Sequence, residues 1–167
     1  MTAPLVITAH LDDDTFAILD GMRRRHFPPA LNKVPAHISL FHHLPGEELA
    51  TVRATVAQSC RDTRSHDLEP LEARFLGRGV ALAYRSPELS RLHGELARQW
   101  RDWLTPQDRQ PFKAHVTIQN KVEPAVARAL HASLAGVPPP SCRIDGITIW
   151  RYLDGPWERV KTCSFAA

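Results

Sequence analysis

Two tetrapeptides of the sequence share a pattern of residue types that could move protons. One is His37-Ile38-Ser39-Leu40 and the other is His115-Val116-Thr117-Ile118, so each reads histidine, apolar, hydroxyl, apolar. The two copies lie about half the chain apart, and each is followed by a turn and a helical pattern. A single copy of so loose a pattern would carry little weight, but two copies at corresponding positions indicate a functional pair.

The chemistry that such a pair can perform is general acid–base catalysis on a phosphate ester. An imidazole has a pKa of about 6.5, so near neutral pH one ring can accept a proton while another donates one. The attacking water or hydroxyl loses a proton as the leaving oxygen gains one. We therefore expect His37 and His115 to be the catalytic pair, with the choice of acid and base open. Ser39 and Thr117 would donate hydrogen bonds to the non-bridging phosphate oxygens, without a metal or other cofactor.

The elements that must position these residues are two strands, predicted at residues 36–41 and 114–119. Side chains alternate between the two faces of a strand. The apolar residues of both motifs would then lie in the core, while the histidines and hydroxyls would face a shared cleft.

The rest of the chain repeats the same order of elements. Further strands are predicted at residues 5–9, 71–76, 80–84, 143–152 and 158–165, and helices at about 13–26, 47–60, 87–104 and 123–136. Each half is thus strand, helix, strand, helix, strand, and the second half adds one strand. This order predicts a diverged duplication within one domain, residues 1–167, with lobes of approximately 1–77 and 78–167.

Composition excludes several classes of protein. The chain is 43% hydrophobic and 23% charged with a net charge of +3, which argues against disorder and permits an anionic partner. Its three cysteines are widely spaced, so we expect neither disulfides nor a zinc site and favour a reducing cytoplasm. No signal peptide or membrane span is evident, and we expect a monomer. The arginines at 23–25 are interpreted as a solvated last helical turn, and Trp100, Trp103 and Leu104 as core residues.

Several other side chains are candidates for substrate binding. His42 could reach the rim of the cleft, and Lys113 could contact phosphate. The triplet Trp150-Arg151-Tyr152 combines aromatic rings with a cation, as in binding of single-stranded nucleic acid, although an ordinary half-buried strand explains it equally well. Alternation places Arg151 opposite both aromatics. A metal site at His42 and His43 is not expected, because no cysteine or carboxylate lies at a known ligand spacing.

The twin motifs resemble those of the two-histidine phosphoesterases, specifically the 2′-5′ RNA ligase-like branch of bacterial type. Residues 34–36, 112–114 and 119–122 resemble the usual flanks of the motifs. Residues 149–153 and 155–158 are typical of a bacterial subgroup, so the resemblance covers nearly the whole chain. It implies a bilobal α+β fold with two antiparallel sheets around a central cleft. It also implies activity on 2′,3′-cyclic phosphate or related phosphodiester ends of RNA or nucleotides, with His37 and His115 catalytic and Ser39 and Thr117 binding phosphate.

Two other functions stay open. One is 2′-5′ RNA ligation by the same histidines, which the residues do not separate from hydrolysis. The other is a non-catalytic module that binds RNA or nucleotides in the same cleft. The presence of both histidines as well as both hydroxyls argues against the module, because binding alone needs no matched proton donor and acceptor.

Overall fold

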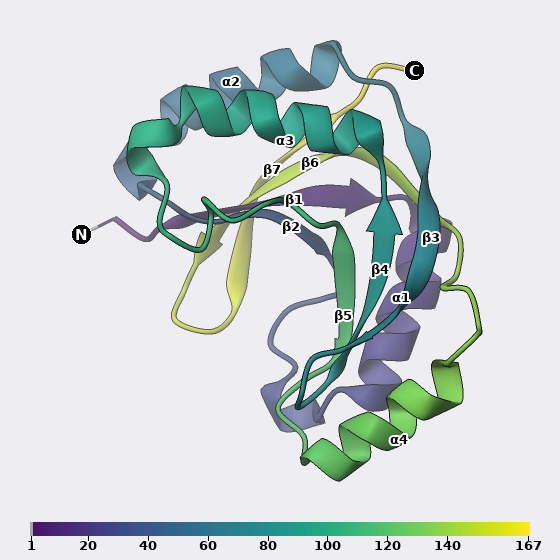
Figure 1. Cartoon of the computed structure of the whole chain (residues 1–167). Helices are drawn as coiled ribbons and strands as arrows, with labels where there is room; N and C mark the ends of the chain where they lie inside the picture. The colour runs from purple at the N-terminus through teal and green to yellow at the C-terminus, as the bar shows by residue number, and fades with distance from the viewer. Residues whose placement is uncertain (1) are drawn as a thin grey trace.

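The chain folds into seven β-strands, four α-helices and three short 3-10 turns over residues 2–167, the part that this computed structural model describes (Figure 1). The 3-10 turns span Pro29–Leu31, Gly46–Glu48 and Arg101–Trp103. The strands are β1 (Leu5–Leu11), β2 (Ile38–Leu44), β3 (His66–Phe75), β4 (Val80–Arg85), β5 (His115–Gln119), β6 (Cys142–Tyr152) and β7 (Trp157–Ser164). The helices are α1 (Asp13–His26), α2 (Leu49–Arg61), α3 (Pro87–Gln99) and α4 (Pro124–Leu134). This order confirms the predicted α+β class.

The strands form one antiparallel sheet in the order β2-β1-β6-β3-β4-β5, with β7 on β6. The predicted two sheets are therefore two groups of strands that join where β6 meets β3. At the junction, His66 to Leu68 of β3 pair with Cys142 to Ile144 of β6, while β3 pairs with β4 from Glu69 onward.

Pairing also crosses the two halves of the sequence. Strand β3 comes from the first half but pairs along most of its length with β4, whereas β6 comes from the second half and pairs with β1. The division into lobes at about residue 77 stays a prediction, and these two strands are exchanged across it.

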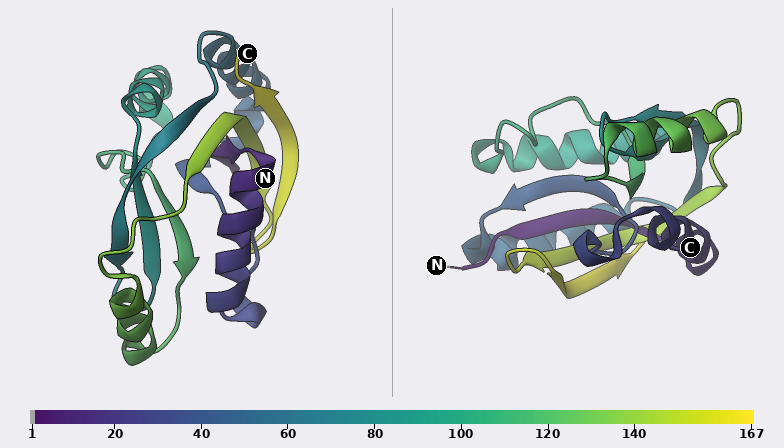
Figure 2. Two further views of the ribbon diagram at one scale, coloured as in Figure 1. Left: turned by 90° about the vertical axis from the view of Figure 1, so that its right-hand side faces the viewer. Right: turned by 90° about the horizontal axis from the view of Figure 1, so that it is seen from below.

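The two ends of the sheet approach each other. Strand β5, at one end of the order, has residues within 8 Å of β2 at the other end, measured between Cα atoms. Helix α1 packs against β5, while α2 packs against β6 and β7, and α4 against β3 and β4 (Figure 2). The strands that carry the two histidine motifs are thereby brought together.

Local sequence explains where several elements begin and end. Asp12 caps α1 by accepting a hydrogen bond from the Thr15 N–H, and Ser86 caps α3 in the same way before Pro87. Gly77 has a φ of 88°, in the left-handed region, and makes the predicted turn between β3 and β4.

Several predicted boundaries differ from the observed ones, and β2 runs from Ile38 to Leu44 instead of over residues 36–41. Helix α3 ends at Gln99, and the chain continues as a 3-10 turn rather than as helix to Leu104. Helix α2 begins at Leu49 after another such turn. Strand β3 starts at His66, five residues before the predicted start. The prediction missed this part because most side chains of β3 are exposed, so the strand lacks the apolar alternation that marks a half-buried strand.

The core confirms the assignment of the aromatic segment after α3. Trp100 is 2% exposed and its ring meets Phe41 edge-on at 5.0 Å between centroids. Trp103 and Leu104 are partly buried against the same core. These side chains pack the fold, as predicted.

Candidate functional site

The two histidine motifs lie as the alternation predicted. Ile38, Val116 and Ile118 are fully buried, and Leu40 is 2% exposed. His37, Ser39, His115 and Thr117 are each half-buried. His115 is the first residue of β5, whereas His37 directly precedes β2.

The two imidazole rings are held by the same local hydrogen bond. Nδ1 of His37 donates to the Pro35 carbonyl at 2.7 Å, and Nδ1 of His115 donates to the Lys113 carbonyl at 2.8 Å. A carbonyl oxygen can only accept, so in both rings Nδ1 carries the hydrogen. Each neutral ring therefore has its free lone pair on Nε2, where a proton can be taken up or released.

The surroundings of His37 hold its ring uncharged. Burial lowers the pKa of His37 to about 4, although the hydrogen bond to the Pro35 carbonyl acts in the opposite direction. The positive charges of Arg23, His115 and His42 lower it further. The ring of His37 is thus uncharged at pH 7.

Trp157 covers one side of His37. The two ring centroids are 4.7 Å apart with planes at 55°, and Trp157 also meets Trp150 at 5.9 Å. Because Trp157 lies in β7, it reaches His37 from the C-terminal hairpin. The segment of Trp157, residues 155–158, entered the sequence-based prediction only as part of the family resemblance, and its contact with His37 was not predicted.

Three of the four motif residues line two cavities, one for each histidine. The first, called the His37 cavity, is lined by His37 with Thr8, Phe16, Trp150 and Arg159 among others. The second, called the His115 cavity, is lined by His115 with Ser39, His42, Lys113 and Phe112 among others. Thr117 borders neither, but it shares a face of β5 with His115.

The three residues of the predicted Trp150-Arg151-Tyr152 triplet differ in their position relative to the two cavities. Trp150 lines the His37 cavity, and its indole N–H donates to the Thr8 hydroxyl at 2.9 Å. Arg151 instead forms an ion pair with Glu158 at 3.3 Å, and Tyr152 is 40% exposed near the end of the hairpin. Of this triplet, only Trp150 is therefore placed to meet a ligand of these two cavities.

Arg23 is a residue that sequence reasoning missed. It is 5% exposed, so the interpretation of residues 23–25 as a wholly solvated turn was wrong for its first member. Its guanidinium donates to the Thr117 carbonyl at 2.9 Å and to the Asn32 side chain at 2.8 Å. Thr15, Leu19 and Arg23 form one helical stripe with a spacing of four, and this spacing could have revealed its burial.

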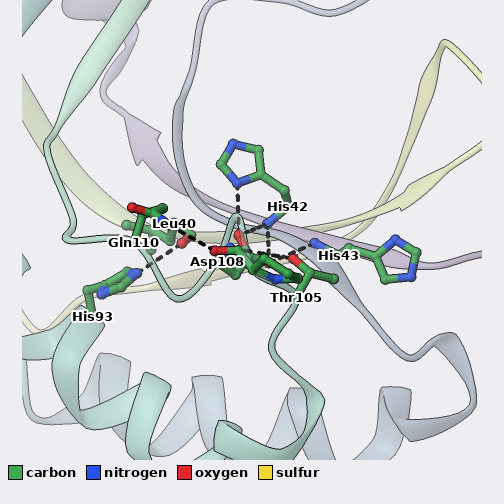
Figure 3. Close-up of polar contacts among 8 residues, drawn as sticks. Leu40, His42, His43, His93, Thr105, Asp108 and Gln110 are labelled. Atoms are coloured by element: carbon green, nitrogen blue, oxygen red, sulfur yellow. Dashed lines mark hydrogen bonds and ion pairs between the residues drawn. The ribbon is translucent and has the colours of Figure 1, made fainter.

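Asp108 is a second missed residue, and it orients His42. Its carboxylate accepts from Nδ1 of His42 at 2.8 Å and from the backbone N–H groups of His42 and His43 (Figure 3). The pair is separated by more than sixty residues, so no local pattern indicates it.

A metal-ligand cluster and a membrane-spanning helix each have structural requirements that the described residues do not meet. Among residues 2–167, no cluster of three or more histidine, cysteine, aspartate or glutamate side chains could hold a metal ion. In the same part of the chain, none of the helices is both long and apolar enough to cross a membrane.

Solved structures share this fold over nearly the whole chain. The protein TT0787 of Thermus thermophilus is 17% identical with a TM-score of 0.68, and the match covers 97% of each chain. E. coli LigT complexed with 3′-AMP is 19% identical with a TM-score of 0.68 and full coverage of both chains. E. coli LigT complexed with NADP+ is 18% identical with a TM-score of 0.64, covering 99% of each. No curated protein matches the sequence.

The fold and the paired histidines define an α+β protein of the two-histidine phosphoesterase type. The family model of the 2′-5′ RNA ligase superfamily matches residues 11–156. The chain belongs to this superfamily, whose members are enzymes of phosphoesterase or ligase type. The resemblance inferred from the motifs is thus confirmed.

Proposed function

We propose that this protein is a metal-independent phosphoesterase that acts on 2′,3′-cyclic phosphate or related phosphodiester ends of RNA or nucleotides. The observation that carries the proposal is the matched presentation of His37 and His115, each with Nδ1 on a backbone carbonyl and Nε2 free. Membership of a superfamily of phosphoesterases and 2′-5′ RNA ligases supports the reaction class.

In the proposed mechanism His37 is the general base, because its lowered pKa keeps the ring uncharged at neutral pH. Nε2 of His37 takes a proton from the attacking water while the water oxygen forms a bond to phosphorus. The bond from phosphorus to one ribose oxygen breaks, and His115 gives that oxygen a proton through its own Nε2. The product is a phosphomonoester, and Ser39 and Thr117 donate hydrogen bonds to the non-bridging oxygens.

Nucleotides are the expected ligand class. E. coli LigT, which shares the fold, has been solved with 3′-AMP, with ATP and with NADP+. In this chain, Trp150 in the His37 cavity and Phe112 in the His115 cavity offer aromatic surfaces to a base.

Ligation is the second candidate, and the family name favours it. A 5′-hydroxyl of RNA would replace water as the nucleophile, and the same two histidines would move the same protons. Incubation with RNA fragments that end in 2′,3′-cyclic phosphate and 5′-hydroxyl, followed by product analysis, separates a joined strand from a hydrolysed end.

The proposal is tested by assaying hydrolysis of a nucleoside 2′,3′-cyclic phosphate in excess chelator. We expect conversion to a single phosphomonoester at the same rate with and without chelator. Binding of the nucleotide with no turnover would favour the non-catalytic module, and a rate that collapsed in chelator would refute metal independence.

The pH profile tests the assignment of the base. If His37 is the base, kcat/KM of the free enzyme rises with pH through about 4, where His37 loses its proton. Trp157→Ala uncovers the His37 ring, so its pKa should rise toward the ordinary value of about 6.5 and carry the ascending limb with it. The measurement is kcat/KM from pH 3.5 to 9 in both proteins, using about half-unit steps. A limb that fell rather than rose through about pH 4 would make His37 the acid instead.

A further inference from the structure

An irregularity in β2 turns His42 toward the site. Thr8 of β1 pairs with Ser39, while the preceding residue Ile7 pairs with Phe41, so β2 carries an extra residue at this step. Such a bulge reverses which face the following side chains occupy. Phe41 would otherwise face the cleft but is fully buried, and His42 lines the His115 cavity instead.

A buried carboxylate fixes His42 in this position. A second register shift in β2 lies between Phe41 and Leu44, at His42 and His43. The backbone N–H groups of both histidines donate to Asp108, at 2.8 and 3.0 Å, and the ring of His42 donates to the same carboxylate. Figure 3 shows the rings of His42 and His43 pointing apart, with Asp108 between the strand and the ring of His42.

Asp108 keeps its negative charge and leaves one nitrogen of His42 free. Burial alone would raise the pKa of Asp108, but the hydrogen bonds from His42 and His43 outweigh it and the pKa is lowered. The Asp108 side chain is 1% exposed, whereas that of His42 is 40% exposed. Because the carboxylate occupies Nδ1, a ligand in the His115 cavity meets the ring of His42 through Nε2.

Two cations, Arg74 and Lys113, face the same cavity as His42. Arg74 of β3 pairs with Ala81 of β4, which pairs with Thr117 of β5, so Arg74 stands in one row with a motif hydroxyl on the same face of the sheet. Lys113 lies two residues before His115. Across residues 2–167, neither cation forms a salt bridge, and both line the His115 cavity with His42.

We propose that His42, Arg74 and Lys113 form a subsite in the His115 cavity for a second phosphate of the substrate, beside the phosphate held by the motif residues. The inference rests on the proposed function for the first phosphate. Its ligand is a nucleotide that carries a phosphate on its 5′ side as well as the reacting phosphate at the 2′ and 3′ positions. Either a free nucleotide 5′-phosphate or the phosphodiester that leads into an RNA end supplies this group.

The test measures equilibrium binding, so it does not depend on turnover. Calorimetric titration with adenosine 3′-monophosphate and adenosine 3′,5′-bisphosphate gives the ratio of their dissociation constants. In the parent protein we expect the bisphosphate to bind at least about tenfold more tightly, because Arg74 and Lys113 donate charge-assisted hydrogen bonds to the added phosphate. Arg74→Gln and His42→Ala should each bring the ratio to within about twofold of one.

His43→Ala is the matched control. His43 is the next residue of β2 and is also exposed, and its backbone N–H binds Asp108, but its side chain lines a different cavity beside Pro45. This variant should keep the parental ratio. Arg74→Gln leaves Asp108 and its contacts in place, so it tests the subsite even if His42→Ala weakens the fold.

A dinucleotide with a terminal 3′-phosphate distinguishes the two sources of the second phosphate. Tighter binding of both this dinucleotide and the bisphosphate identifies an RNA end, and tighter binding of the bisphosphate alone identifies a free nucleotide. Equal affinity of the parent for adenosine 3′-monophosphate and the bisphosphate would overturn the subsite, and so would a ratio unchanged in Arg74→Gln. Failure of the proposed function is a different result, namely absence of cyclic phosphate turnover whatever the binding ratio.

Discussion

Replacing either His37 or His115 by alanine is expected to lower kcat/KM for hydrolysis of a 2′,3′-cyclic phosphate by about 10³-fold. The reason is that in the proposed mechanism each ring moves one proton, His37 from water and His115 to the leaving oxygen. The loss should fall mainly on kcat, because the proton transfers take place in the transition state and not on binding. The measurement is steady-state kinetics on a purified nucleoside 2′,3′-cyclic phosphate.

Two comparisons separate lost chemistry from lost structure. His37→Gln and His115→Gln retain a side-chain amide that can donate to the same carbonyl but does not titrate, so they should be as inactive as the alanine variants. His66→Ala is the control, because Nδ1 of His66 donates to the Arg64 carbonyl two residues before it, as in the two motif histidines, yet His66 lies outside both cavities. This variant should retain turnover. Undiminished activity in any variant of His37 or His115 would defeat the two-histidine mechanism.

The alternation of side chains explains how much of this site the sequence predicted. A strand has a period of two, so the order histidine, apolar, hydroxyl, apolar already states which side chains share a face. The structure places Ile38 and Val116 in the core and leaves His37 and His115 half-buried. The order of helices and strands could also be predicted from local sequence, because a helix cap such as Asp12 or a turn such as that at Gly77 depends on only a few residues.

What the sequence did not predict depends on contacts between distant segments. The extra residues of β2 are defined only relative to β1, so regular alternation did not predict that Phe41 turns inward, although His42 was already a candidate for the rim of the cleft. The exchange of β3 and β6 between the two groups of strands is likewise a pairing choice that no single strand encodes. Asp108 lies in an irregular segment whose partner is far along the chain.

The difference between the rings of His37 and His115 also arises from contacts between distant segments. Their motifs are nearly identical and their hydrogen bonds to backbone carbonyls are equivalent, which is why the sequence left acid and base unassigned. Trp157 packs on His37 from the C-terminal hairpin, and Arg23 adds a positive charge from α1. The neutral base in the proposed mechanism is therefore a product of tertiary packing and not of the motif itself.

Removal of either motif hydroxyl is expected to cause a large loss of turnover. Ser39→Ala and Thr117→Val are each expected to lower kcat by about 10²-fold with a smaller change in KM, as for loss of one donor to a developing oxyanion. As phosphorus becomes five-coordinate, charge grows on the non-bridging oxygens, so a donor contributes most in the transition state. Valine has nearly the shape of threonine and suits a strand, so Thr117→Val should not disturb β5.

Rescue by a conservative variant decides whether the hydroxyl itself is responsible. Thr117→Ser keeps the donor and removes only a methyl group, so it should recover most of the activity that Thr117→Val loses. The Arg23 guanidinium binds the backbone carbonyl of Thr117 and not its side chain, so this anchor of β5 is present in all three proteins. If Thr117→Ser were as slow as Thr117→Val, the loss of activity would come from the missing methyl group and not from the hydroxyl. The proposal that Thr117 stabilises the phosphate oxygens would then be wrong.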